Sequence, residues 1–185
     1  MSEELVIRYC APTLAGIKTG SLFSYAPETG EDLRAEIRRL NRMLVRKGLR
    51  VLPLSKQRRR VMIYVYRPER LRADFRGAQT GALLRQHGYC SGRPEQCVAA
   101  LMAKLRDQED FPHEIGLFLG YPPEDVRGFM EHRGCGCKCV GCWKVYGDVQ
   151  RAAELFARYQ QCTDIYLHAW QNGKSIEELA VRSVS

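Results

Sequence analysis

Residues 32–66 read DLRAEIRRLNRMLVRKGLRVLPLSKQRRRVMIYVY, and this stretch indicates the fold class. From Asp32 to Lys47, three leucines and an isoleucine recur every three or four positions, and arginines occupy many of the positions between them. That spacing predicts an amphipathic helix with one face on a core. Gly48 follows at the position where a helix commonly ends in a left-handed glycine.

The second half of the same stretch contains two apolar runs, residues 49–54 and 61–66, on either side of the polar segment 55–60. Two such runs with a short connection predict an antiparallel hairpin with a basic loop. The run 61–66 is apolar at nearly every position, so we expect it in the centre of a sheet, covered on both faces. Pro53 has no backbone N–H to donate, which places the first strand nearer an edge.

Outward from this helix and hairpin, the sequence predicts two more short strands, over residues 5–10 and 143–146. Helical patterns occupy much of the remaining chain, at residues 69–75, 80–87, 94–106, 148–170 and 176–181, with two short helices inside 111–130. We therefore expect a single α+β domain over residues 1–185, in which a small, mainly antiparallel sheet packs with several helices.

The 185-residue chain is 45% hydrophobic and 27% charged, a composition that is ordinary for a globular domain and excludes a disordered or collagen-like protein. Its longest uninterrupted apolar run, residues 61–66, is far shorter than the roughly 20 residues that cross a bilayer. The acidic start, Met1–Glu4, is followed by no apolar segment of signal-peptide length. We expect a cytoplasmic protein that does not enter a membrane.

Positive charge is concentrated in one part of the chain. The net charge is +8, yet residues 34–60 alone carry +10, from eleven basic residues and the single acid Glu36. Such a stripe attracts a polyanion such as nucleic acid, an anionic lipid or an acidic protein. The residues expected to contact nucleic acid or an acidic partner are Arg38, Arg42, Arg46, Arg58, Arg59 and Arg60. A solvated helix face with a charged hairpin tip explains the same charges without any partner.

Several stretches of the sequence together resemble the bacterial family of domains of unknown function numbered 3793. They read CAPTLAGIKTGSLF at 10–23, YVYRP at 64–68, FPHEIG at 111–116 with LGYP at 119–122, and WKVYGD at 143–148. The resemblance implies an anaerobic, reducing cytoplasm, and it brings no assigned activity, cofactor or site residue with it. The chain has more cysteines before the last stretch than the family pattern has, so a metal site there would belong to this chain and not to the family.

Half of the eight cysteines lie in one loop. Cys135, Cys137, Cys139 and Cys142 form C-x-C-x-C-x-x-C, with glycines between and beside them. Thiolates are preferred ligands of zinc and of iron–sulfur clusters, and glycines let the chain fold tightly enough for sulfurs to converge. We therefore expect zinc or an iron–sulfur cluster here, although the spacing matches neither paired zinc knuckles nor the ferredoxin run. Redox-sensitive surface thiols and structural packing are the alternatives.

Cys10 is a candidate nucleophile, because it ends a predicted strand just before Pro12, where free backbone N–H groups and a helix dipole would lower its pKa. His113 would be its base, Glu114 would orient the imidazole, and Lys18 would attract an anionic substrate. A buried, unreactive cysteine is the alternative. The sequence thus supports two main hypotheses: chemistry through cysteine sulfur, enzymatic or not, and a non-enzymatic binding module with a basic helix and hairpin. A ligand-binding or regulatory domain with neither activity is a third possibility.

Overall fold

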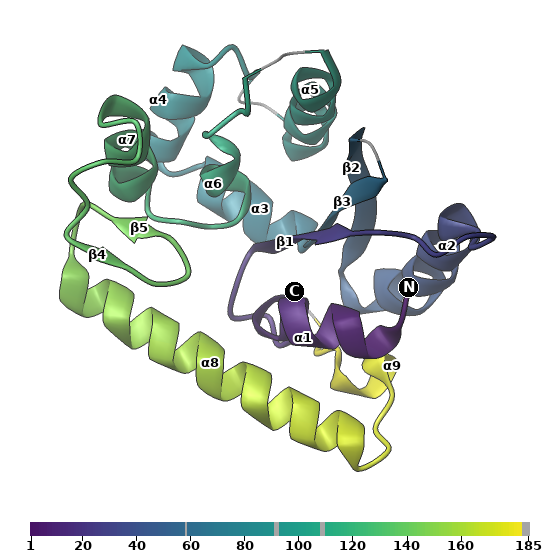
Figure 1. Cartoon of the computed structure of the whole chain (residues 1–185). Helices are drawn as coiled ribbons and strands as arrows, with labels where there is room; N and C mark the ends of the chain where they lie inside the picture. The colour runs from purple at the N-terminus through teal and green to yellow at the C-terminus, as the bar shows by residue number, and fades with distance from the viewer. Residues whose placement is uncertain (58, 91–92, 108–109, 183–185) are drawn as a thin grey trace. The chain divides into compact units, whose positions relative to one another are not determined.

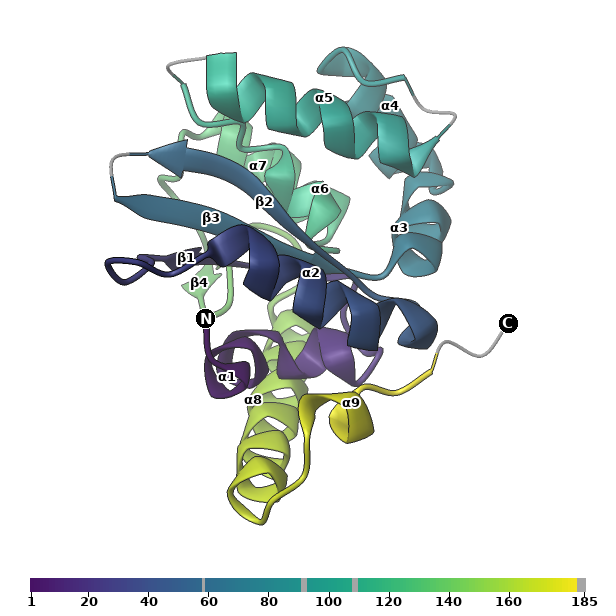
Figure 2. The same ribbon diagram turned by 90° about the vertical axis from the view of Figure 1, so that its right-hand side faces the viewer.

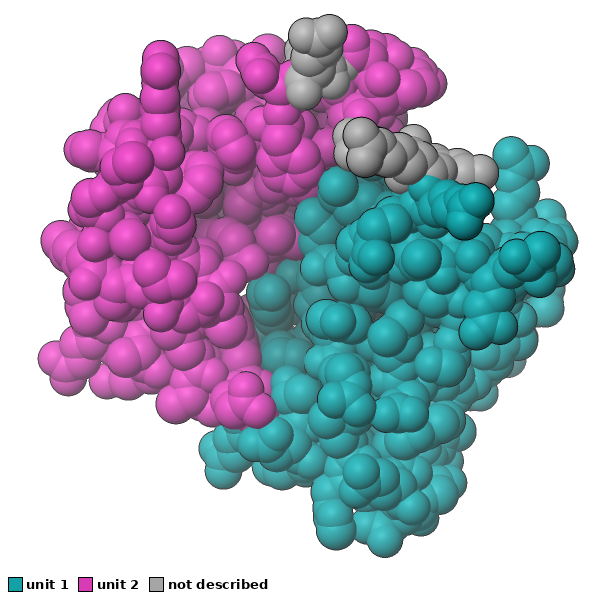
Figure 3. All heavy atoms as spheres, viewed as in Figure 1, with its two compact units in different colours: residues 1–69, 161–185 teal, residues 70–160 magenta. Residues whose placement is uncertain are grey.

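The computed structural model describes residues 1–57, 59–90, 93–107 and 110–182. Figure 1 shows its helices and strands, and Figure 3 colours its two compact units. Unit 1 consists of residues 1–69 and 161–185, and unit 2 of residues 70–160. Helices and a small antiparallel sheet make up the structure, which confirms the α+β class. That the chain is one domain stays a prediction.

The sheet of unit 1 has the strand order β1–β3–β2, and both pairings are antiparallel (Figure 1). The predicted hairpin is confirmed as β2 (Arg50–Gln57) and β3 (Arg60–Tyr66), with β3 in the centre. β2 is an edge strand whose register shifts between Pro53 and Ser55, as expected for a proline that cannot donate to a ladder. The other edge is β1 (Gly20–Tyr25), a segment for which the sequence pattern gave no assignment.

The predicted amphipathic helix is confirmed as α2 (Leu33–Leu44), followed by a single 3-10 turn, η1 (Val45–Lys47), and by Gly48 at φ 78°. Its buried residues are Ile37, Leu40 and Leu44. On the same helix, the Asn41 side chain donates to the Val51 carbonyl at 2.8 Å and accepts from the Val51 N–H at 2.9 Å. Asn41 thereby satisfies backbone groups of the edge strand β2 that have no neighbouring strand.

The predicted strand at residues 5–10 is wrong, because this segment belongs to helix α1 (Glu3–Leu14). The hydroxyl of Ser2 accepts a hydrogen bond from the Leu5 N–H at 3.3 Å and thereby caps the helix. Acidic residues in the first turn stabilise the helix further, because their negative charge lies at the positive end of the helix dipole. The apolar run then lies along one helical face in the core of unit 1, with Val6, Ile7, Cys10 and Leu14 fully buried.

Arg67, directly after β3, joins three segments of unit 1: the end of α1, η1 and the chain after the last helix, α9 (Ile176–Leu179). Its side chain is 1% exposed. The guanidinium donates to four backbone carbonyls, those of Thr13 at 2.7 Å, Leu14 at 2.6 Å, Lys47 at 3.1 Å and Val181 at 2.7 Å. The carbonyls at a helix end have no partner within the helix. The Thr13 and Leu14 carbonyls also accept from the backbone N–H groups of Gly16 and Val181, so Arg67 adds a charged donor to each of them.

The helices predicted in the middle of the chain are confirmed. The elements of this region are α3 (Pro68–Phe75), α4 (Ala78–Gln86), α5 (Pro94–Asp107), α6 (Ile115–Phe118), α7 (Pro123–Glu131), β4 (Cys139–Val140) and β5 (Lys144–Val145). The strand predicted at 143–146 is present as β5, but it pairs with β4 in a separate two-stranded sheet and not with the main one. The long predicted helix is α8 (Val149–Gln171). Among the described residues, none of the helices has the length and apolar composition needed to cross a membrane.

Candidate functional site

Four arginines form a line on the face of α2 and η1 that points away from the core. Arg34, Arg38, Arg42 and Arg46 follow one another at intervals of four residues, and all four side chains are exposed. Residues four apart on a helix are about 40° apart around it and about 6 Å apart along it, so the four arginines wind across about a third of the helix surface over about 18 Å. We call these four residues the arginine row. Three of them belong to the expected contact set, and Arg34 extends it.

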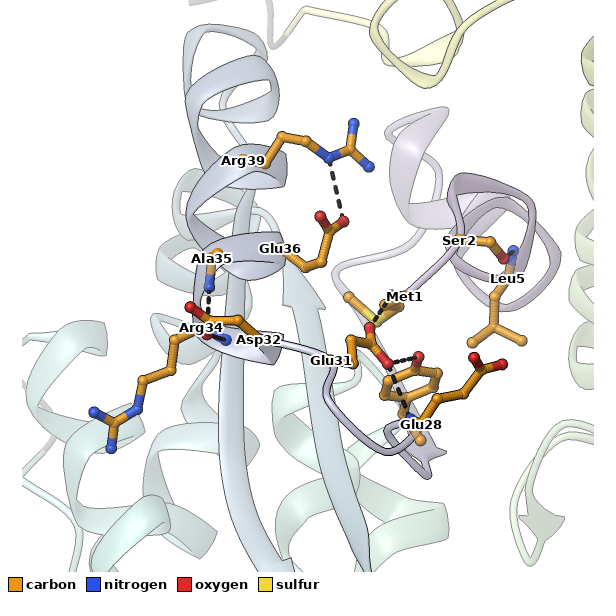
Figure 4. Close-up of polar contacts among 11 residues, drawn as sticks. Met1, Ser2, Leu5, Glu28, Glu31, Asp32, Arg34, Ala35, Glu36 and Arg39 are labelled. Atoms are coloured by element: carbon orange, nitrogen blue, oxygen red, sulfur yellow. Dashed lines mark hydrogen bonds and ion pairs between the residues drawn. The ribbon is translucent and has the colours of Figure 1, made fainter.

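The charges of the arginine row are not neutralised locally: within the described part of the chain, no carboxylate forms an ion pair with any of the four. Arg39, in contrast, pairs with Glu3 at 2.7 Å and with Glu36 at 3.2 Å. The hydrogen bond to Glu3 contributes most to raising the pKa of Arg39. In Figure 4, the guanidinium of Arg39 lies beside Glu36, whereas that of Arg34 points away from the acidic side chains drawn.

The hairpin adjacent to α2 contributes further exposed charge. Figures 1 and 2 show α2 beside β2 and β3, and α2 packs against β2. Arg59 is exposed. Arg60 is exposed as well, but its guanidinium donates to the Ser24 hydroxyl at 2.7 Å and is thereby held on β1. Arg58, the third expected contact in the hairpin, lies outside the described residues.

Cys10 does not have the surroundings expected of a nucleophile. It lies inside α1 and is 0% exposed. Burial raises its pKa to about 12, although the charge of Lys18 and a hydrogen bond with Ser21 act in the opposite direction. The expected lowering of this pKa is therefore wrong, because the thiol lies in an apolar core and not at the start of a helix. Cys10 and Lys18 belong to unit 1, and their expected partners His113 and Glu114 belong to unit 2.

Glu114 and His113 do not form the expected base-orienting pair. Glu114 is buried and accepts hydrogen bonds from the Tyr89 hydroxyl at 2.9 Å and the Lys104 ammonium at 2.8 Å. Burial raises the pKa of Glu114, but hydrogen bonds, chiefly that from Lys104, outweigh burial and leave the pKa below its ordinary value. The His113 side chain is exposed, and its ring lies edge-on to Phe129 at 4.9 Å between centroids. Within the described chain, no hydrogen bond joins Glu114 to His113.

The four cysteines of the loop are accessible, since Cys135 and Cys142 are exposed and Cys137 and Cys139 are half-buried. In the described residues, no three His, Cys, Asp or Glu side chains come together as a set of metal ligands. The expected convergence of the four sulfurs is therefore not found. Part of the loop is extended as β4 of the small hairpin, and extended chain separates successive side chains. Zinc or iron–sulfur binding stays a prediction.

Unit 2 also contains a cavity of about 290 Å³ that the sequence did not predict. Residues of α6, α7 and the β4–β5 hairpin line it, and the rings of Tyr121, Phe129 and Trp143 form part of its walls. The rings of Tyr121 and Trp143 stack on each other with centroids 4.7 Å apart. Phe129 forms a further wall, and Lys144 and His113 contribute polar groups.

Asp125 holds the Trp143 wall of this cavity in place. Its carboxylate, 3% exposed, accepts hydrogen bonds from the Trp143 indole N–H and from the backbone N–H groups of Tyr146 and Gly147, each at 2.7 Å. A buried carboxylate is stable only when donors of this kind replace water. The Asp125 carboxylate thus has a structural role, because its hydrogen bonds fix the position of the Trp143 ring.

Three stretches of the sequence point to this cavity. The stretches 111–116, 119–122 and 143–148 carry the family resemblance, and each contributes residues to the cavity lining. The pattern of each stretch predicted local structure. It did not indicate that the three stretches meet around one space.

Comparison with known proteins gives one match. The family model described as a protein of unknown function (DUF3793) matches residues 6–180, so the chain belongs to this family, and the resemblance inferred from the sequence is confirmed. Neither the search of curated proteins nor the search of solved structures found a match.

Proposed function

We propose that the protein is a non-enzymatic binding module whose arginine row binds the phosphate backbone of nucleic acid. The observation that carries the proposal is the line of four exposed arginines for which the described residues provide no carboxylate partner. A guanidinium presents a planar fork of donors that matches phosphate oxygens. An arginine that is not already paired can replace a condensed counterion, and the release of counterions drives association.

The composition of α2 favours binding without base recognition. Residues 33–47 contain no aromatic side chain that could stack on a base. Arg59 adds an exposed charge on the neighbouring hairpin. Contacts to phosphate fix the position of a protein on nucleic acid but carry no sequence information, so we expect similar affinity for duplexes of different sequence.

Chemistry through cysteine sulfur has less support. The Cys10 thiol is buried with a raised pKa, and the loop thiols do not form a ligand set among the described residues. None of the eight cysteines, all of which the structure describes, forms a disulfide. Reduced thiols in this number fit a reducing compartment, and we place the protein in the cytoplasm.

The test measures binding of the full chain to a fluorescein-labelled duplex of about 20 base pairs by anisotropy, between about 50 and 200 mM salt. The double variant R38A/R42A should reduce the slope of log affinity against log salt by about 2, because each lost phosphate contact removes roughly 0.9. Alanine is the best helix former, so α2 is expected to fold in this variant.

The matched control is R85A/R151A, which removes two exposed helix arginines of unit 2 and the same net charge. Its salt slope should equal that of the unchanged protein. Equal losses in both double variants, or no binding at the lowest salt, would overturn the proposal. If polyglutamate binds through the arginine row and the duplex does not, the partner is an acidic protein and the assignment to nucleic acid is wrong.

A further inference from the structure

The kind of ligand that the aromatic cavity of unit 2 can bind depends on which of its polar groups already have hydrogen-bond partners in the protein. The Asp125 residue lines the cavity but is buried, and its carboxylate accepts three hydrogen bonds from the protein. It is therefore not expected to bind a cation from solvent. The other charged residue of the lining is Lys144, whose ammonium lies 5.8 Å from the centroid of the ring of Phe129, another lining residue.

Lys144 has donors to spare. Its ammonium donates to the Gly134 carbonyl at 2.7 Å and lies 5.8 Å from the centroid of the Phe129 ring. An ammonium has three N–H donors, so two are left after the bond to Gly134. In the described parts of the chain, no carboxylate forms an ion pair with Lys144. A half-buried cation beside aromatic walls favours an anion that also has an apolar body.

The size and the walls of the cavity limit what the apolar body is. A volume of about 290 Å³ has room for a molecule of roughly 10 to 15 non-hydrogen atoms, since a water molecule occupies about 30 Å³ of liquid. A dinucleotide or a peptide would extend beyond this volume. The rings of Tyr121, Phe129 and Trp143 offer faces and edges against which a planar ring packs best. One ammonium suits one negative charge, whereas a phosphate dianion requires more donors.

We propose that this cavity binds a small aromatic monocarboxylate, whose ring packs against Tyr121, Phe129 and Trp143 and whose carboxylate accepts hydrogen bonds from the Lys144 ammonium. The exposed imidazole of His113 lines the same cavity and offers an additional polar contact. The site consists of residues of unit 2 alone and does not depend on the arginine row. It gives the protein a ligand in addition to the polyanion proposed above.

A series of matched ligands tests the proposal on the full-length, unmodified chain by calorimetry. Benzoate has both the ring and the charge, benzyl alcohol keeps the ring without charge, and acetate keeps the charge without the ring. Benzoate should bind at least about tenfold more tightly than benzyl alcohol, because a hydrogen bond to a charged group adds this much. It should exceed acetate by at least about as much, because acetate has no ring to bury against the aromatic side chains. Failure of benzoate to bind at about 10 mM, or equal affinity for benzyl alcohol, would overturn the proposal.

Two lysine variants place the ligand within the structure. K144M keeps the length of the side chain and removes the ammonium, and it should weaken benzoate binding by about tenfold while leaving the binding of benzyl alcohol unchanged. K138M is the control, since Lys138 is an exposed lysine of the same loop that donates to the Gly147 carbonyl at 2.8 Å and does not line the cavity. Equal weakening by both variants would show that the anion is not held at Lys144.

Discussion

Unit 1 uses arginine in two opposite ways. Arg67 is 1% exposed, and its guanidinium donates to carbonyls of three chain segments. The arginine row on α2 is exposed and has no carboxylate partner among the described residues. The comparison teaches that the arginines of a basic chain can have different roles. One arginine stabilises the backbone of unit 1, and four others are available to a partner.

The physical difference between the two is desolvation. A buried guanidinium has lost its hydration and is stable only because carbonyl oxygens replace water, so removal of either side leaves unsatisfied polar groups. An exposed arginine keeps its hydration, and its removal costs the fold little. Free energies of unfolding therefore separate a structural arginine from one that is available for binding.

The largest expected effect is that of replacing Arg67. R67M should lower the free energy of unfolding by about 4 kcal/mol, because the carbonyls at the end of α1 and after α9 lose a charged donor inside the protein. Urea unfolding followed by circular dichroism measures the change. R67K should recover only part of the loss, since an ammonium lacks the planar fork that reaches several carbonyls at once.

R42M is the control for R67M, because Arg42 belongs to the arginine row and the same atoms are removed from an exposed position. Its unfolding free energy should stay within about 0.5 kcal/mol of the original value. If R67M and R42M were equally stable, the distinction between the two kinds of arginine would be wrong.

Asp125 is the counterpart of Arg67 in unit 2. It is a buried charge of opposite sign whose hydrogen bonds also stabilise the fold. D125N should lower the stability by about 2 to 3 kcal/mol, because one oxygen becomes an NH₂ group that faces another donor, such as the Trp143 indole N–H. Urea unfolding measures the loss, and a red shift of the tryptophan emission in a W170F background, where Trp143 is the one tryptophan left, reports the loosened wall. D148N alters an exposed carboxylate that accepts from the Arg151 N–H at 3.0 Å, and it should change stability by less than about 0.5 kcal/mol.

The smallest expected effect on stability comes from Cys10, whose buried thiol is neutral. Its pKa is raised to about 12 from the ordinary 9.0, so the folded state keeps the proton after the unfolded state has lost it. Its contribution to stability is fully present below pH 9.0 and is lost as the pH rises through the window up to about 12, by at most about 1.4 kcal/mol per pH unit. C10A should lack this component of the alkaline decline.

The measurement compares urea unfolding of the unchanged protein and C10A at about pH 7 and about pH 10.5. The small cavity left by C10A lowers stability equally at both pH values, so only the difference between them reports the thiol. C142A, at an exposed cysteine, should decline with pH as the unchanged protein does. Parallel declines for all three proteins would show that the Cys10 thiol titrates normally.

Parts of the fold were predictable because their patterns are long and consistent. The helix α2, its glycine stop and the β2–β3 hairpin follow from periodicity and turn residues, since each is stabilised by its own burial pattern. The strand predicted at 5–10 failed because a short apolar run fits a strand and a helix equally well. The cap at Ser2 and the buried face in the core decide for the helix.

The candidate sites were predictable to different degrees. The arginine row could be anticipated because helical spacing alone places exposed residues on the side opposite the core. The Cys10 prediction depended on a strand that does not exist. The aromatic cavity depends on residues 113–116 and 121–129 meeting residues 140–144, and no local pattern reports such a contact.

By itself, the sequence determined the family, the α+β class and a helix with its charged side outward, because local periodicity, turn chemistry and charge are properties of neighbouring residues. The tertiary structure alone decided that Cys10 is buried, that Arg67 binds carbonyls from three segments, and that the Lys144 ammonium lies beside the Phe129 ring. Burial and hydrogen-bond partners come from residues far apart in the chain. The pKa of a thiol and the availability of a cation depend on these surroundings and not on the residue type.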